Sequence, residues 1–164
     1  VRDAGLADPS AFVVLIRVVG TTLNESLLTA ISEGRDQDAR RLIDQGAGFD
    51  VDGRPVKEAG SSILHLAIRA RLQDFALYLI RCDADIHATN EIGRHPLSIA
   101  AIKGLNEVVV ELIGKRANLE QKDLTGKTAL QHAVNRGNFR LQKDVLIQLN
   151  GGDTALLEAP FTLR

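Results

Sequence analysis

The sequence predicts an all-α solenoid, in which pairs of short helices joined by turns stack one upon another. Three observations predict this architecture. Glycines at positions 60, 93 and 126 stand 33 residues apart, each is followed four residues later by a Leu-x-x-Ala pattern, and a second apolar segment follows at a constant distance. A fixed period of this length is typical of repeat architectures. Each two-helix unit must stack, because alone it cannot bury its apolar face.

The first unit precedes these three at a longer interval. Leu27 and Ala30 stand 37 residues before Leu64 and Ala67, whereas the later units follow one another at 33 residues. The connection between the first and second units therefore carries four extra residues. We place this insertion within Asp50 to Ala59, which contains a glycine and a proline.

Local residue preferences predict the helices of the third unit. Gly93 supplies the backbone freedom with which the chain turns into a helix, and Pro96 fits the first helical position, where its missing N–H is not needed. Gly104 is expected to end this helix, and Arg71 and Gly137 hold the equivalent position in the neighbouring units. The second helix is predicted at Asn106 to Gly114, with an inward face made of Val108, Val109, Leu112 and Ile113.

Three segments align without gaps and carry a family resemblance: Gly60-Ser-Ser-Ile-Leu-His-Leu-Ala67, Gly93-Arg-His-Pro-Leu-Ser-Ile-Ala100 and Gly126-Lys-Thr-Ala-Leu-Gln-His-Ala133. They resemble the ankyrin repeat, with its 33-residue period and its Thr-Pro-Leu-His-x-Ala signature. Each unit keeps one of three signature residues. The second unit keeps the histidine (His65), the third keeps the proline (Pro96), and the fourth keeps the threonine (Thr128).

This resemblance covers about Asn24 to Leu149, most of the chain. It implies an ankyrin-repeat solenoid in which each unit is a β-turn followed by two antiparallel helices. The implied repeats are at about 24–56, 57–89, 90–122 and 123–149.

Residues 1–23 are predicted to form an N-terminal apolar arm or capping helix. The segment Ala11 to Val19 is apolar except for Arg17, and Asp8-Pro9 and Gly20 are expected to cap a short helix there. One interpretation is a helix that covers the open apolar face of the first unit. The other is an arm that docks in another subunit and so builds a larger assembly.

Residues 150–164 are interpreted as a degenerate cap or as the start of a fifth repeat. Gly152 to Ala159 repeats the opening of a unit, arrives early, and is interrupted by Pro160. Terminal units are expected to be polar on one side, and the second helices of the first and last units carry the charged and polar residues Asp36, Asp38, Arg40, Arg41, Gln142, Lys143 and Asp144.

Composition excludes several classes of function. The 20 basic and 21 acidic side chains give a net charge of −1, without the basic excess of a general nucleic-acid binder. The longest apolar run, Ala11 to Ile16, is far shorter than the about 20 residues that span a membrane, so no membrane insertion is expected. The single cysteine, Cys82, indicates an intracellular protein, cytoplasmic or nuclear. The chain begins at Val1 and contains no methionine, which indicates a fragment or processed product.

No constellation of residues predicts catalysis, a metal or a cofactor. The Gly46-Ala-Gly48 segment lacks the rest of a phosphate-binding loop and is interpreted as a helix-ending turn. Asp50-Val-Asp52-Gly53 lacks the later ligands of a calcium loop and is interpreted as a solvated turn. His87 and His95 have no cysteine or carboxylate at ligand spacing, and Cys82 is expected to be a plain thiol. By the resemblance, His65 and His95 take positions that hydrogen-bond neighbouring turns. We therefore predict that the chain is not an enzyme.

The resemblance implies a partner on the concave side, which turn tips and the exposed face of the first helices form. The turn positions are Glu58, Ala59, Ser61, Glu91, Ile92, Arg94, Leu124, Thr125 and Lys127, the helix positions are Arg69, Ala70, Ile102, Lys103, Asn135 and Arg136, and Cys82 and Lys115 lie at the rim. Six of these residues are cations and two are acids. We hypothesise a basic groove with apolar anchors at Ile92, Ile102 and Leu124 that binds a segment of another protein with acidic and apolar side chains.

The favoured function is a non-enzymatic protein–protein interaction module, a scaffold or adaptor. The alternative is a structural subunit, or a domain excised from a larger protein assembly, which the apolar arm and the unfinished unit at Gly152 favour. The sequence does not select a partner.

Overall fold

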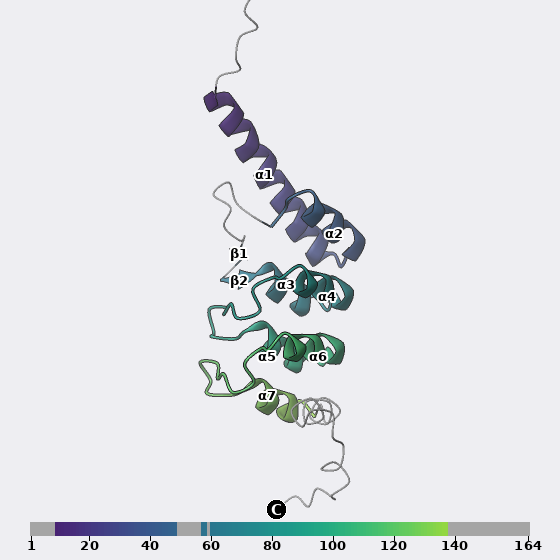
Figure 1. The fold of residues 1–164 in the computed structure, drawn as a ribbon, viewed down its shortest axis with the longest axis vertical. Helices are drawn as coiled ribbons and strands as arrows, with labels where there is room; N and C mark the ends of the chain where they lie inside the picture. The colour runs from purple at the N-terminus through teal and green to yellow at the C-terminus, as the bar shows by residue number, and fades with distance from the viewer. Residues whose placement is uncertain (1–8, 49–56, 59, 138–164) are drawn as a thin grey trace, which may run out of the picture.

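The computed structural model describes residues 9–48, 57–58 and 60–137. In chain order its elements are α1 (Pro9–Ser32), α2 (Asp36–Asp44), β1 (Lys57–Glu58), β2 (Ser61–Ser62), α3 (Ile63–Arg69), α4 (Gln73–Arg81), α5 (Pro96–Lys103), α6 (Asn106–Gly114) and α7 (Ala129–Asn135). Figure 1 shows helix pairs stacked along one axis, with the turns on one side and α2, α4 and α6 on the other. The fold is the all-α ankyrin-type solenoid that the repeat predicts.

The first helix of each later unit begins at a residue suited to that position. Ser62 and His65 form a reciprocal capping pair at α3, and Thr128 and Gln131 form another at α7. α5 begins with Pro96, as predicted. The capping side chains accept hydrogen bonds from backbone N–H groups that have no partner inside the helix. Proline has no such N–H group, so none is left without a partner at its position.

The helices end at residues in the left-handed conformation. Gly104 (φ 71°) follows α5 as predicted, and Arg71 (φ 61°) adopts the same conformation after α3. Arg71 Nη2 donates a hydrogen bond of 2.9 Å to the carbonyl oxygen of Lys103. The arginine therefore links the second unit to the end of α5, which a glycine at this position would not do. Asp83 and Arg116 are also left-handed, after α4 and α6.

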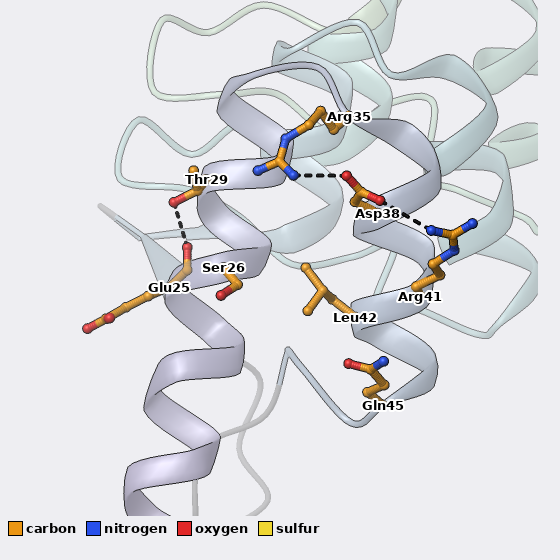
Figure 2. A pocket seen from close by; sticks show the side chains of 8 residues that line it. All are labelled: Glu25, Ser26, Thr29, Arg35, Asp38, Arg41, Leu42 and Gln45. Carbon is orange, nitrogen blue, oxygen red and sulfur yellow. Dashed lines mark hydrogen bonds and ion pairs between the residues drawn. The ribbon is translucent and has the colours of Figure 1, made fainter.

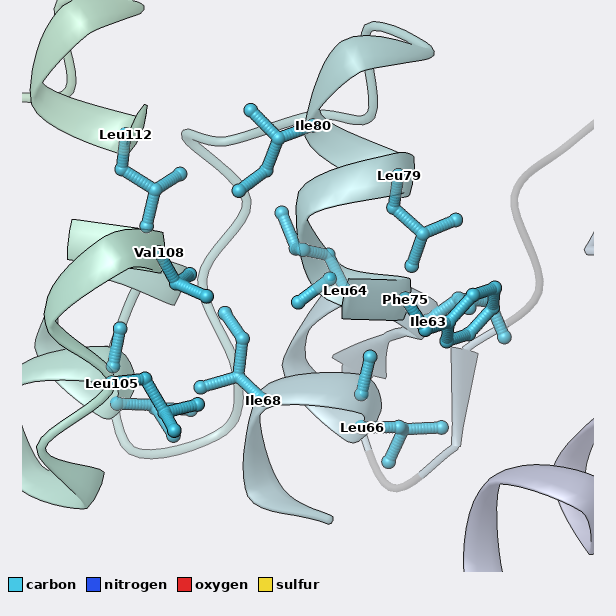
Figure 3. Packing of buried hydrophobic residues seen from close by; sticks show 14 of the residues in the cluster. Ile63, Leu64, Leu66, Ile68, Phe75, Leu79, Ile80, Leu105, Val108 and Leu112 are labelled. Atoms are coloured by element: carbon cyan, nitrogen blue, oxygen red, sulfur yellow. The ribbon is translucent and has the colours of Figure 1, made fainter. Parts of the chain in front are cut away.

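Apolar side chains of both helix layers form a continuous core. Leu64 and Leu97 are buried at equivalent sites in consecutive layers, whereas Leu130 in the next layer is half-buried. α6 has the predicted bounds and buries Val108, Val109 and Leu112, with Ile113 half-buried. Figure 3 shows residues of α3 and α4 packed against residues of α6 across this layer.

The turns rest on one another along the stack. The Leu124 N–H donates to the Ile92 carbonyl oxygen at 3.2 Å. A Cβ at Gly60 would lie 2.7 Å from Glu91 Cγ, and one at Gly93 would lie 3.0 Å from Leu124 Cγ. Both glycines also have positive φ, so a side chain at either site would be strained and crowded. β1 and β2 pair antiparallel across the first of these turns.

The two histidines expected to bond neighbouring turns differ. His65 Nε2 lies 3.0 Å from the carbonyl oxygen of Arg94 in the next turn, which confirms the prediction. His95 Nδ1 faces Ser98 Oγ of its own helix at 3.2 Å, and the backbone of Asn118, in the segment after α6, also interacts with its imidazole. For His95 the bond to a neighbouring turn therefore stays a prediction. Burial lowers the pKa of this imidazole, against the opposing effect of the Asn118 backbone.

The prediction of a short N-terminal helix that ends at Gly20 is wrong. α1 is one helix of 24 residues that continues through Gly20 into the first unit. An isolated glycine costs only about 1 kcal/mol inside a helix, and the flanking turns are helical. A helix continuous with the first unit does not fold back over it, and Figure 1 shows its N-terminal half extending past α2.

Several predictions lie outside the described residues. They concern most of the insertion within Asp50 to Ala59, the second helix of the last unit, and the segment Gly152 to Ala159. The domain boundaries stay predictions.

Candidate partner-binding surface

A groove of about 440 Å³ lies where the C-terminal ends of α1, α3 and α5 meet. We call it the helix-end groove. Three of the predicted partner-binding residues, Arg69, Ala70 and Lys103, line it. Its other lining residues are Leu28, Ile31, Ser32 and Leu66. The structure thus brings together predicted residues from the second and third units and adds residues of the first.

The helix-end groove has an apolar floor with cations at its edge. Ile31 and Leu66 are 3% and 7% exposed, and Leu28 is half-buried. Arg69 is exposed and Lys103 half-buried, and neither forms an ion pair with any described residue. Both lie in the last turn of their helices, where a cation also stabilises the helix dipole.

The turn tips add an exposed apolar pair. Ile92 is 46% exposed and Leu124 is 77% exposed, which makes them two of the three exposed large hydrophobic residues of the described structure. The turn–turn hydrogen bond joins them, and Leu124 lies against Gly93. Glu91 takes the equivalent place on Gly60 one turn earlier. One turn therefore presents an apolar side chain where the previous turn presents a carboxylate.

Arg94 was expected as a cation of the basic groove, and the structure holds it in an ion pair. Its Nε lies 2.9 Å from Oδ2 of the fully buried Asp123 carboxylate, which also contacts His132 Nε2 at 2.8 Å and Thr125 Oγ1. Burial alone would raise the pKa of Asp123, but hydrogen bonds from Thr125, Arg94 and His132 outweigh it and hold the pKa far below its usual range. Arg94 thus joins two consecutive units.

The remaining predicted residues divide between surface and structural positions. Lys115 pairs with Asp83 at 3.1 Å, so it is not a free cation. Ile102 is half-buried, which weakens its expected role as an exposed anchor. The residues Glu91, Lys127, Asn135 and Arg136 are exposed.

A larger hollow than the helix-end groove lies on the outer face of the first unit. It measures about 640 Å³ and lies between α1 and α2. Figure 2 shows its side chains, with Arg35 bonded to Asp38 and Asp38 to Arg41. Among its lining residues Leu42 is the one with a large apolar side chain. This face is polar, as expected for a terminal unit.

The described residues offer no second site of the other kinds that the sequence raised. No group of three histidine, cysteine or acidic side chains there is placed to hold a metal ion. Cys82 is an exposed free thiol at the end of α4. Gly46 and Gly48 have positive φ after α2, which confirms the helix-ending turn. None of the described helices has the length and hydropathy of a membrane span.

Sequence reasoning missed the floor of the helix-end groove. Ser32 precedes Arg69 by the 37-residue interval of the first unit, so the repeat register could have found it. Leu28 and Ile31 carried no such signal, because buried core and groove floor have the same apolar pattern.

Comparison with known proteins agrees with this architecture. Residues 59–91 match the family model described as Ankyrin repeat. The chain is 32% identical over 129 residues to the human "Neurogenic locus notch homolog protein 2", and the mouse protein of that name matches equally. It is 29% identical over 119 residues to "Glycerophosphocholine phosphodiesterase gde1" of Schizosaccharomyces pombe.

These alignments are long in this chain and short in the relatives. They cover 78% of the chain for the notch homologues and 72% for the yeast protein. The chain spans 5% and 10% of those relatives. The similarity therefore concerns the repeat region and not the whole proteins.

Proposed function

Because this chain is an ankyrin-repeat protein, we propose that it is a non-enzymatic interaction module that binds a segment of another protein on its concave side. Ankyrin repeats generally mediate protein–protein interaction. The observation that carries the proposal is the helix-end groove, where Arg69 and Lys103 flank a floor of buried apolar side chains. A cofactor has no part in it.

The partner segment carries acidic and apolar side chains. Its carboxylates pair with Arg69 and Lys103, which steer the encounter and set the register more than they add affinity. Its apolar side chains contact the groove floor and the exposed pair Ile92 and Leu124, since buried apolar anchors supply most binding energy. Lys127, Asn135 and Arg136 extend the surface toward the last unit.

The yeast relative is named as a phosphodiesterase, but the chain spans a tenth of it, so no such activity is proposed here. With one free thiol and no disulfide partner, we place the protein inside the cell, in cytoplasm or nucleus.

The test is selection of binding peptides from a random phage library on the immobilised chain. Peptides rich in Asp or Glu beside Leu, Ile or Phe are expected. Their affinity should fall with salt, because charges are screened over about 10 Å at 0.1 M. The double variant Arg69→Glu, Lys103→Glu should bind at least about tenfold more weakly.

A matched control is Arg41→Glu with Lys122→Glu, which changes net charge equally at exposed sites outside the helix-end groove. Its affinity should equal that of the native chain. Equal losses in both double variants, with folding intact, would refute a specific site.

A second candidate function is a structural role in a larger assembly. The continuation of α1 past the first unit favours it, because this helix projects from the stack in Figure 1. Deletion of residues 1–19 should then abolish co-assembly while leaving peptide binding unchanged.

A further inference from the structure

A groove of about 500 Å³ lies between α4 and α6, on the side of the stack away from the turn tips. We call it the second-helix groove. Its lining residues are Gln73, Leu77, Arg81, Gly104, Asn106, Glu107, Val110 and Glu111. It shares none of them with the helix-end groove, so it is a separate surface.

The same seam is closed one unit earlier, between α2 and α4. There Tyr78 Oη donates to Asp44 Oδ1 at 2.5 Å, and the Arg40 guanidinium lies 5.7 Å from the centre of the Tyr78 ring. Arg40 also pairs with Asp36. A phenol ring, a carboxylate and a guanidinium thus meet between the two second helices.

The repeat register shows why the next seam is open. Glu111 takes the place of Tyr78, Arg81 that of Asp44, and Leu77 that of Arg40. Arg81 and Glu111 have opposite charge, yet they form no ion pair in the described structure. The Tyr78–Asp44 contact of the first seam therefore has no counterpart here, and the bond across this seam runs from Gln73 to Glu107 instead.

Helix stability accounts for two of the three charges of this groove, but not for Glu111. Arg81 lies in the last turn of α4, where a cation is favourable. Glu111 lies near the C-terminus of α6, where a carboxylate opposes the helix dipole. Glu107 lies in the first turn of α6, where a carboxylate is favourable. It stands four residues before Glu111, so the two carboxylates repel each other by a few tenths of a kcal/mol. Gln73 Nε2 donates to Glu107 across the seam at 2.9 Å, and no cation among the described residues forms an ion pair with either acid.

Apolar surface lies beside these acids. Leu77 and Val110 are half-buried and line the groove from its two helices. We infer that the second-helix groove is a second docking surface, which takes a partner segment with a Lys or Arg side chain on Glu107 and Glu111 and an apolar side chain on Leu77 and Val110. Its charge is opposite to that of the helix-end groove. The module therefore joins two segments of opposite charge.

The test introduces the residues of the α2–α4 seam at the equivalent positions of the α4–α6 seam. We call this double variant, Arg81→Asp, Glu111→Tyr, the closed variant. The test uses the peptides that a random phage library yields on the native chain. Peptides with Lys or Arg beside Leu or Ile should lose at least about tenfold in affinity for the closed variant. Arg69→Glu, Lys103→Glu should bind them as the native chain does, and acidic peptides should show the reverse dependence.

Unchanged affinity for the closed variant, or no basic class of peptides, would overturn the second surface and leave the proposed function standing. Concentration-dependent dimers that the closed variant loses would also overturn it, since the occupant would be a second copy. If the closed variant fails to fold, Glu111→Gln keeps the shape of the side chain. It should lower affinity and reduce the salt dependence.

Discussion

The outer face of the first unit and the matching face of the second unit have the same helical framework and opposite chemistry. In the repeat register, Asp38 of α2 corresponds to Phe75 of α4, and Thr29 of α1 corresponds to Leu66 of α3. Phe75 and Leu66 are 0% and 7% exposed, whereas the first-unit residues line an open polar hollow (Figure 2). Side chains, and not the helical framework, decide whether a face accepts another unit.

The polar face is made of exposed ion pairs. Arg35 contacts Glu33 at 2.7 Å and Asp38 at 2.8 Å, with side chains about half exposed. Exposed pairs of this kind contribute little to stability. These charged side chains keep the face hydrated and oppose the stacking of an apolar unit on it. The apolar face of the second unit, in contrast, stabilises the stack.

The largest change in the free energy of unfolding is expected when the equivalent residues Phe75 and Asp38 are each replaced by the other. Phe75→Asp removes a buried ring and places a carboxylate in the core, so we expect a loss of at least about 4 kcal/mol in the free energy of unfolding. Asp38→Phe should change it by less than about 1 kcal/mol. Urea denaturation measures both, and comparable losses would refute the distinction between the two faces.

A second pair of substitutions, with smaller expected effects, compares the same two faces without adding a charge. Leu79 is 6% exposed, and its counterpart Leu42 is half-buried in the first unit. Leu79→Ala should cost about 3 kcal/mol, and Leu42→Ala about 1 kcal/mol, because less contact surface is lost there. Thermal and urea unfolding of the two variants test the ratio.

The ion pairs at the unit junction should be worth more than those on the outer face. Asp123→Asn keeps the turn, since Asn90 holds the same position and accepts the equivalent backbone N–H groups. It removes the charge that Arg94 and His132 face, so we expect a loss of about 2 kcal/mol near pH 7.

The pH dependence of stability checks the same residue. The pKa of Asp123 is lower in the folded chain than in the unfolded chain. Its contribution is therefore present above the unfolded pKa of about 4 and is lost as the pH falls below it. The Asn variant should show a shallower loss of stability between about pH 5 and pH 2. An identical acid limb would contradict this assignment.

The smallest effect is expected on the polar face itself. Arg35→Ala breaks both exposed ion pairs and should cost less than about 0.5 kcal/mol, with the difference vanishing at high salt. Urea titrations at low and high ionic strength measure it. A loss near that of Asp123→Asn would show that the outer face stabilises the stack.

Local signals predicted much of the fold. Pro96, Gly104 and the apolar spacing from Asn106 to Gly114 placed two helices at their observed bounds, because caps and periodicity act within a few residues. Gly20 was misleading, since a glycine is compatible with both a helix end and a helix interior. The capping pair of Ser62 and His65 was not expected, because the histidine was assigned to the next turn alone.

The sequence by itself determined the repeat, the stacking of its units and the residue types along the concave side, since each follows from a pattern that is local or periodic. Only the tertiary structure decided which of those cations are available. Arg94 and Lys115 are held by carboxylates of other turns, while Arg69 and Lys103 line the helix-end groove together with Leu66. Such pairings join residues about one repeat apart, and their geometry depends on how side chains pack between units.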